Sequence, residues 1–465
     1  MNGKRKFLTL DDFMTSKLTS STFTWRQIVR LQIPLILDNL SIMFINTLIM
    51  ALISGNGDES VAAVSLVGPI SGLITCLFSA ISSGSTVVVA QCLGRKNEVI
   101  LKKSNGMAMW ITTALGLILC MPVVLRPDIL LNLLYRNIEP AVMEKACIFL
   151  SGSAVSNIVF TVYLSIFSVL RGLGESQKCL VLSVIINVAY FLFSILFLNV
   201  MNLDILGSAY ALILARVAGA VAAFVAMFLW KPSVRISVKD VFSFEWRLFR
   251  SNLQVSLPLA LEQVFANLGG IVSQMYMAAL GTAALAANAI INSLLGFMYS
   301  PAASTSNLSV AVVGRCIGAK RHDEAFVYGK RCTQISRVLM VFAILLFYPL
   351  LPLLLKQYHL EPESYHAVLI ILLSNVPFLL TVWPISTVMH STLQAASDAM
   401  FPSVVSLIAL WTMTIGLGYV AAIPLGLGLW GVWIGNWAAW IFRSIMFTLR
   451  YRQKKWLYKS NLQEA

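Results

Sequence analysis

Apolar stretches of 18 residues or more recur along the whole 465-residue chain, and they constrain its fold more than any other feature. A stretch of this length crosses a hydrocarbon layer of about 30 Å as a helix, whose backbone hydrogen bonds are all internal. Only 12% of the residues are charged, against about 25% in soluble domains. The sequence therefore predicts an all-α polytopic membrane protein. Its twelve expected membrane-spanning helices are 28–53, 61–92, 104–125, 140–170, 179–200, 206–230, 252–279, 283–314, 333–355, 364–393, 402–423 and 429–449.

The distribution of lysine and arginine orients these helices, because basic flanking residues stay on the cytoplasmic side of a membrane. With a cytoplasmic N-terminus, 29 of the 34 basic residues fall in cytoplasmic segments and four in outer loops. The remaining one, Arg216, lies within the 206–230 helix. We therefore expect both termini in the cytoplasm. The net charge of +14 comes mostly from this excess of cytoplasmic basic residues. These residues are attracted to the anionic lipids of the inner leaflet, and nucleic-acid binding is a poor explanation for them.

The chain repeats itself at an offset of 224 residues. Residues 34–98 align without a gap to 258–322, with 14 identities in 65 positions. A duplicated six-helix unit explains this match. Since six is an even number, both bundles enter the membrane from the same side and are related by a pseudo-twofold axis along the membrane normal, as in many secondary transporters. The expected organisation is an N-terminal lobe at 1–230, a cytoplasmic linker at 231–250 and a C-terminal lobe at 251–465.

Two carboxylates lie deep in the predicted helices at matching positions of the repeat. Asp38 and Glu262 each follow a proline, Pro34 and Pro258, by four residues, and the prolines are the expected kink points of their helices. A charged side chain at such depth costs about 2.5–3.5 kcal/mol on insertion. A carboxyl group there can be protonated, bind a cation, or exchange one for the other, as an ion-coupled carrier requires. The alternative is a carboxyl group that bonds a free backbone carbonyl and serves helix packing only.

Polar and aromatic side chains on the same predicted helices are candidates for the lining of a central cavity. They are Asn39, Asn46, Asn187, Tyr190, Arg216, Gln263, Asn267, Asn288, Asn292, Tyr299 and Trp383. Aromatic faces suit organic cations, at about 0.5–2 kcal/mol per contact. The alternative for each group is hydrogen bonding or packing between helices. Arg216 has three candidate roles: pairing with a carboxylate, binding an anionic group, or packing with its charged head near the interface.

Sequence patterns of enzymes are absent. The chain has no P-loop, no GxSxG and no histidine and cysteine cluster with metal-ligand spacing. Seven cysteines without a CxxC pair are expected to be reduced packing residues. We therefore expect no enzymatic activity and no cofactor.

Several motifs resemble those of the multidrug and toxic-compound extrusion (MATE) family, most closely its bacterial members. They are ESVAAVSL at 59–66, SSGSTVVVAQCLGRKNE at 82–98, VLRGLGES at 169–176, LPLALEQ at 257–263, GTAALAANAI at 281–290 and VAVVGRCIGAKRHDEA at 310–325. Their order and spacing, rather than any single motif, carry the resemblance, which covers nearly the whole chain.

The resemblance implies two six-helix lobes in a V, with a central cavity open alternately to each side. It also implies export of amphipathic, often cationic, organic compounds against an inward flow of protons or sodium ions. A cation site at Glu262 and an N-lobe role for Asn187 follow from matching family positions. The chain departs from the family at Ile49 and Phe191, where members carry aspartates. Either Asp38 replaces that pair, or Glu262 carries the coupling alone.

We therefore expect a monomeric, secondary active antiporter in the cytoplasmic membrane of a bacterium, with small organic molecules as cargo and H⁺ or Na⁺ as the coupling ion. Asp38 or Glu262 would hold that ion. Two alternatives are a flippase for lipid-linked oligosaccharides, which shares the two-lobe design, and a non-transporting membrane scaffold. A flippase of this kind favours a basic central cavity. The predicted helices contain one deep cation, Arg216, and two deep carboxylates, which disfavours a flippase. The paired buried acids argue against a scaffold.

Overall fold

The computed structural model describes residues 23–53, 58–134, 140–201, 203–230, 245–356 and 362–459, and this part of the chain is almost entirely helical. The contacts group it into two compact units. The N-unit is Leu37–Val264, and the C-unit is Phe265–Ala465 together with Met1–Ile36. Both divisions fall inside helices, α2 (Trp25–Ile53) and α10 (Trp246–Ala279). The linker expected at 231–250 lies mostly outside the described residues, and the lobe limits stay a prediction.

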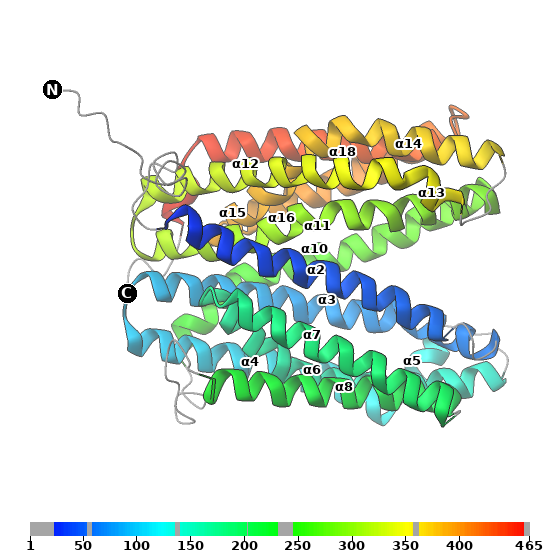
Figure 1. Ribbon diagram of the computed structural model, residues 1–465, viewed down its shortest axis with the longest axis horizontal. Helices are drawn as coiled ribbons and strands as arrows, with labels where there is room; N and C mark the ends of the chain where they lie inside the picture. The colour runs from blue at the N-terminus through cyan, green and yellow to red at the C-terminus, as the bar shows by residue number, and fades with distance from the viewer. Residues whose placement is uncertain are drawn as a thin grey trace. The chain divides into compact units, whose positions relative to one another are not determined.

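The N-unit is built around α6, which its neighbours enclose. Its helices are α3 (Asp58–Gly94), α4 (Glu98–Leu125), α5 (Pro127–Leu134), α6 (Pro140–Gly172), α7 (Ser176–Ser194), the π-helical η2 (Ile195–Val200) and α8 (Asp204–Phe228), with the adjoining parts of α2 and α10 (Figure 1). Helix α6 packs against α3, α4 and α8. A Cβ atom on Gly152 would lie 2.6 Å from the Cβ of Ala209. Small residues thus let α6 and α8 approach closely, as is common between helices in membranes.

The C-unit is arranged around α11 and α18. It contains α11 (Thr282–Gly318), α12 (His322–Phe347), η3 (Tyr348–Leu350), α13 (Leu351–Lys356), α14 (Pro362–Thr381), η4 (Ile385–Met389), α15 (His390–Ala395), α16 (Met400–Ile408), η5 (Ala409–Leu417), α17 (Gly418–Ala422), α18 (Leu429–Arg452) and η6 (Lys455–Tyr458). Helix α11 packs against α12, α14 and α15, while α18 packs against η5 and α17. A Cβ atom on Gly435 would lie 2.7 Å from the Cα of Gly418, so the backbones nearly touch there.

The predicted all-α membrane architecture is confirmed. Within the described chain, ten helices are long and apolar enough to cross a membrane, and one bent pair makes an eleventh. The last predicted range, 429–449, is occupied by the 24-residue α18. Each of the twelve predicted ranges therefore contains helix.

Two local features differ from the expected helices. The range 364–393 is not one straight helix, because Tyr365–Thr381 and Ile385–Ala395 are inclined by 48° to each other. Pro384 lies at the break, and proline both lacks the N–H that a helix needs and clashes with the preceding turn. The short helix α5, which follows α4, is not among the predicted helices.

A buried ion cluster ties the C-terminal end of α18 to the segment just before α16. The Asp398 side chain has no exposed surface. Arg450 Nε donates to its Oδ2 at 2.8 Å, and Lys459 Nζ donates to its Oδ1 at 2.9 Å. The Arg450 guanidinium also lies over the Phe401 ring, 5.0 Å from the ring centre. This cluster is structural, because both positive partners of the carboxylate are present.

The seven cysteines are free thiols, and five of them are buried. This agrees with their predicted role as reduced packing residues.

Candidate functional site

A cavity of about 420 Å³ lies within the N-unit. Its walls come from α3, α6, α7 and α8, with Ile42 of α2 at the edge. The serine, threonine and asparagine side chains that line it are Thr75, Ser79, Ser82, Ser83, Ser183 and Asn187. Tyr190 and Arg216 line it too, so three of the predicted lining residues meet in one cavity. Its volume is typical of pockets that bind small organic molecules.

Arg216 lies in the middle of α8 and is half-buried, with part of its surface facing the cavity. Its Nη1 donates to Ser156 Oγ at 2.8 Å and to Asn157 Oδ1 at 2.5 Å. The guanidinium lies over the Phe160 ring, 4.5 Å from the ring centre. Among the described residues no carboxylate pairs with it. Pairing with a carboxylate, the first of the three roles predicted for Arg216, is therefore not found among the described residues.

A column of aromatic rings runs along the cavity face of α6. Phe160, Tyr163 and Phe167 follow at spacings of three and four residues, which places them on one side of the helix. The ring centres of Phe160 and Tyr163 are 5.5 Å apart, those of Tyr163 and Phe167 are 5.4 Å apart, and both pairs are stacked. Arg171 closes the other end, with its guanidinium 4.6 Å from the Phe167 ring centre. We call the three rings of Phe160, Tyr163 and Phe167, together with the guanidinium groups of Arg216 and Arg171 at the two ends, the aromatic column.

Asp38 is enclosed next to Ser183, which lines this cavity, and only 2% of the Asp38 surface is exposed. Ser183 forms a side-chain hydrogen bond with its carboxylate, and Arg171 interacts with it electrostatically. The Oδ1 atom has no hydrogen-bond partner in the described part of the chain. Asn187 Nδ2 donates to Ser183 Oγ at 3.3 Å. Asn187 and Asp38, which were predicted separately, are thus linked through Ser183.

Glu262, the second predicted carboxylate, is half-buried in α10. Its neighbour Gln263 is exposed, while Asn39 of α2 is half-buried. Pro34 and Pro258 lie inside α2 and α10, as the repeat predicts. The Asn46 side chain lies outside the described residues.

The remaining candidates belong to the C-unit. Asn267 is half-buried and Asn288 is buried, whereas Asn292 is exposed and donates from Nδ2 to the Asn288 carbonyl oxygen at 3.0 Å. Tyr299 and Trp383 stack with ring centres 4.2 Å apart. Trp383 also contacts Trp440 edge-on at 4.8 Å. Tyr299 and Trp383 therefore belong to a packed aromatic cluster within the C-unit.

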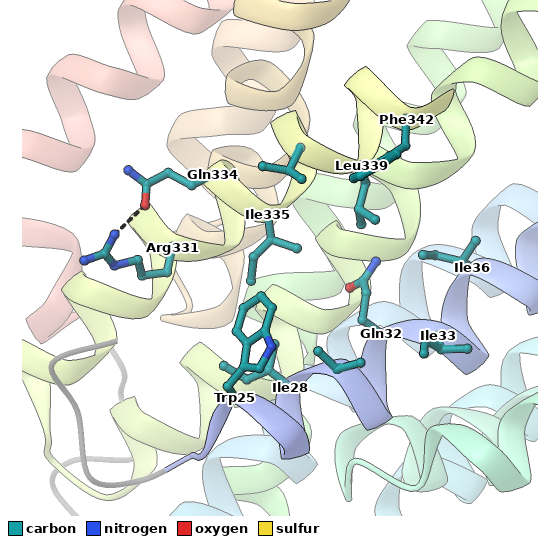
Figure 2. Close-up of a pocket in the computed structure, with 12 residues that line it drawn as sticks. Trp25, Ile28, Gln32, Ile33, Ile36, Arg331, Gln334, Ile335, Leu339 and Phe342 are labelled. Carbon is teal, nitrogen blue, oxygen red and sulfur yellow. Dashed lines mark hydrogen bonds between the residues drawn. The ribbon is translucent and has the colours of Figure 1, made fainter. Parts of the chain in front are cut away.

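The C-unit has a groove of its own, about 430 Å³ in volume, between the first turns of α2 and the stretch of α12 from Arg331 to Phe342. Figure 2 shows Ile28, Ile33 and Ile36 of α2 on one side, with Leu339 and Phe342 of α12 opposite them. Gln32 points between the two helices and donates to Ser304 Oγ at 2.9 Å and Thr305 Oγ1 at 3.1 Å. At one end, Arg331 Nη1 donates to Gln334 Oε1 at 2.8 Å. No residue in the lining of this groove carries a carboxylate, so the lining supplies no site for a coupling cation.

Sequence reasoning missed Arg171 and the aromatic column. The signal was available, because Phe160, Tyr163, Phe167 and Arg171 repeat at spacings of three and four residues along one helix. In the sequence, Arg171 is explained as one more basic residue flanking a helix. The structure shows that it lines the same cavity as Arg216, so the cavity has two arginines where one deep cation was expected.

The family profile described as MatE matches the chain twice, at residues 34–196 and 258–420. The two matches are 224 residues apart, the offset at which the sequence aligns with itself. The duplication predicted from the sequence is therefore confirmed by two copies of one family unit.

Curated relatives and solved structures agree with this match. The "Uncharacterized transporter YisQ" of Bacillus subtilis is 26% identical over 443 residues, covering 92% of this chain and 94% of that protein. The "Probable multidrug resistance protein NorM" of Thermotoga maritima is 22% identical and covers 93% of each chain. A structure described as "MATE in the straight conformation" superimposes with a TM-score of 0.85 at 18% identity, covering 94% of this chain and 97% of that one. The family profile matches well over half of the chain, and the chain therefore belongs to the MATE family of membrane transporters.

Proposed function

We propose that this transporter is a secondary active antiporter, which exports amphipathic small organic molecules, organic cations among them, in exchange for protons or sodium ions. The observation that best supports this is the position of Asp38. It is an enclosed carboxylate with one unpartnered oxygen, hydrogen-bonded to Ser183, which lines a cavity of about 420 Å³ in a membrane-spanning unit. Glu262, at the matching place in the repeat, is the second proposed coupling residue.

The chemistry of exchange follows from one shared negative charge. A proton needs only the Oδ1 atom of Asp38, while a sodium ion needs several oxygen ligands, of which the carboxylate and the Ser183 hydroxyl are two. A cationic cargo in the same cavity would compete with either ion, and competition of this kind is a negative coupling between two binding events. Each elementary charge that crosses 100 mV releases about 2.3 kcal/mol. One imported monovalent ion therefore sustains a gradient of roughly fifty-fold for a neutral cargo, whereas its 1:1 exchange for a monovalent organic cation moves no net charge and is driven by the ion concentration gradient alone.

We place the protein in the cytoplasmic membrane of a bacterium, with both termini in the cytoplasm. The excess of basic residues in the expected cytoplasmic segments supports this orientation. We further propose that it works as a monomer, binds no nucleic acid and needs no cofactor beyond the coupling ion.

The test is efflux of a fluorescent organic cation from loaded cells or everted vesicles, with and without imposed proton and sodium gradients. We expect gradient-driven transport by the parent, and its loss in Glu262→Gln, Asp38→Asn or both, at unchanged protein level. The variant that loses transport identifies the carboxylate through which the ion is coupled. Parent-like transport by both variants would show that these carboxylates are structural, and absence of any gradient effect would refute antiport.

A flippase for lipid-linked oligosaccharides is the second candidate, because Arg171 and Arg216 both line the N-unit cavity. The cavity volume argues against it, since about 420 Å³ suits a drug-sized molecule rather than an oligosaccharide headgroup. Movement of a labelled lipid-linked oligosaccharide between leaflets of proteoliposomes would favour this candidate. The scaffold alternative is removed by the family assignment.

A further inference from the structure

We propose that the groove between α2 and α12 binds an anionic phospholipid, with one acyl chain along the groove and the phosphate at Arg331. Such a lipid site is independent of the proposed transport function, because it needs only the membrane-spanning fold of the C-unit and the lining of the groove. In the proposed orientation, the lipid comes from the cytoplasmic leaflet.

The groove has the form of a channel for an extended chain. Its lining residues recur at spacings of three and four, from Trp25 to Ile36 on α2 and from Arg331 to Phe342 on α12. Residues at this spacing share one face of a helix, so each helix contributes one continuous wall. Each of these stretches rises about 16 Å along its helix. Apart from two glutamines and Arg331, the walls consist of aliphatic and aromatic side chains, which suit an acyl chain.

The groove opens on an apolar and exposed part of both helices. On α12, Val338, Phe342 and Leu345 are 55%, 65% and 67% exposed, and Ile33 on α2 is 52% exposed. Both helices are long and apolar enough to cross a membrane. A large exposed apolar surface on such helices is a contact surface for lipid chains. The surrounding solvent that can enter the groove is therefore hydrocarbon rather than water.

One end of the groove is charged and the other is apolar. Figure 2 shows Arg331 and Trp25 toward one end, with Ile36 and Phe342 toward the other. Arg331 is half-buried, and it is the only charged residue among those that line the groove. It precedes the apolar run of α12, and tryptophan is typical of the membrane boundary. Exposed basic residues follow the same end of the two helices: Arg26, Arg30 and Lys330. Basic groups at this depth attract anionic lipid headgroups.

Arg331 is suited to bind the phosphate of such a headgroup. Its Nη1 donates to the neutral Gln334 Oε1 at 2.8 Å, which holds the guanidinium in place. A guanidinium carries five N–H donors in a planar fork that matches phosphate oxygens. A phosphate without a chain would contact Arg331 and leave the apolar walls unused, whereas a neutral lipid would use only the walls. An anionic phospholipid uses both features of the groove.

The groove is held open by hydrogen bonds that tie the start of α2 to the C-unit. Gln32 Nε2 donates to Ser304 Oγ at 2.9 Å and to Thr305 Oγ1 at 3.1 Å. Tyr328 of α12 accepts from the Phe23 amide at 2.8 Å and donates to the Phe23 carbonyl oxygen at 3.2 Å. The two walls are therefore fixed before a lipid arrives, and a preformed site binds without the cost of ordering its walls.

The experiment is native mass spectrometry of the full-length protein in detergent micelles, titrated with phosphatidylglycerol or with phosphatidylcholine of the same acyl chains. We expect the first phosphatidylglycerol to bind about fivefold or more tightly than the first phosphatidylcholine, since a net negative headgroup gains about that factor beside one arginine. Equal affinities would overturn the proposal. Two further probes separate the parts of the lipid: diacylglycerol lacks the phosphate, and sn-glycerol 3-phosphate lacks the chains. Both should bind more weakly than phosphatidylglycerol, and equally tight binding of sn-glycerol 3-phosphate would show a site for free phosphate instead.

Charge variants locate the phosphate. Arg331→Gln should weaken phosphatidylglycerol binding about fivefold and abolish its preference over phosphatidylcholine, with partial recovery in Arg331→Lys. Arg337→Gln is the matched control, because Arg337 is an exposed arginine of the same helix outside the lining of the groove. It should keep the preference of the parent. Equal losses in the two glutamine variants would assign the preference to the basic surface as a whole and contradict a site at Arg331.

A space-filling variant locates the chain. Leu339 is half-buried in the wall of the groove, so Leu339→Trp should weaken both lipids about tenfold while their affinity ratio stays that of the parent. Leu345→Trp, at an exposed position outside the lining, should bind both lipids like the parent. A retained ratio shows that the Arg331 end is still folded, which a misfolded protein would not show. Parent-like affinity of Leu339→Trp for both lipids would contradict an acyl chain in the groove.

Discussion

Replacing Asp398 by asparagine should destabilise the C-unit severely, although the two side chains have nearly the same shape. The carboxylate is fully buried and accepts from Arg450 at 2.8 Å and from Lys459 at 2.9 Å. The Arg450 side chain is 14% exposed, so without Asp398 its charge would be left enclosed and uncompensated. Removing one partner of such a buried pair costs about 3–5 kcal/mol. A cost of this size is roughly a hundredfold or greater change in the ratio of folded to unfolded protein.

The second partner supplies a control of the same cluster. The Lys459 side chain is 48% exposed, and half-exposed ion pairs contribute about 0–1 kcal/mol. Lys459→Met should therefore cost far less than Asp398→Asn. The assay is equilibrium unfolding in mixed detergent micelles with increasing dodecyl sulfate, followed by tryptophan fluorescence, since Trp456 is buried three residues before Lys459. A cost of Asp398→Asn below about 1 kcal/mol, or equal costs of the two variants, would refute this reasoning.

Two further perturbations test the packing of the C-unit. A Cβ atom on Gly435 would lie 2.7–2.8 Å from backbone atoms of Gly418, so Gly435→Ala should cost about 1–3 kcal/mol in the same unfolding assay. Gly270→Ala has nothing within 4 Å and should be neutral or slightly stabilising, and equal costs would contradict the close approach. Tyr328→Phe removes two hydrogen bonds to the Phe23 backbone, at 2.8 and 3.2 Å, and should cost about 1 kcal/mol. Hydrogen exchange at the Phe23 amide should then accelerate, and an unchanged rate would contradict the assignment.

The membrane-spanning helices were predictable because an apolar run of sufficient length has few alternatives in a bilayer. The duplication was predictable from the same residues, and the two family matches at 34–196 and 258–420 confirm its offset. The break at Pro384 was not predicted, because a proline alone does not locate a break: Pro377, in the same predicted range, lies inside a continuous helix. The grouping of the helix segments was harder to predict, because the C-unit segment that ends at Ile36 and the N-unit segment that begins at Leu37 belong to one continuous helix. Only contacts reveal that α2 and α10 each contribute to both units.

The candidate site was predictable residue by residue but not as an arrangement. Asp38, Asn187 and Arg216 stand out because each is polar within an apolar helix. Their neighbours come from other helices, and one sequence carries no information about which helices meet. Ser183, which connects Asn187 to Asp38, is an ordinary residue in the sequence. Arg171 was overlooked because its position near a helix end has a simpler explanation, the orientation of the chain in the membrane.

The most direct test of antiport is uptake of a fluorescent organic cation by proteoliposomes that contain only the purified protein, with a proton or sodium gradient as the sole energy source. Coupled exchange predicts accumulation against the concentration gradient, up to about the imposed ion concentration ratio for 1:1 exchange of monovalent cations, and its collapse when an ionophore removes the gradient. Equilibration without accumulation, at either gradient, would contradict coupled transport by this protein.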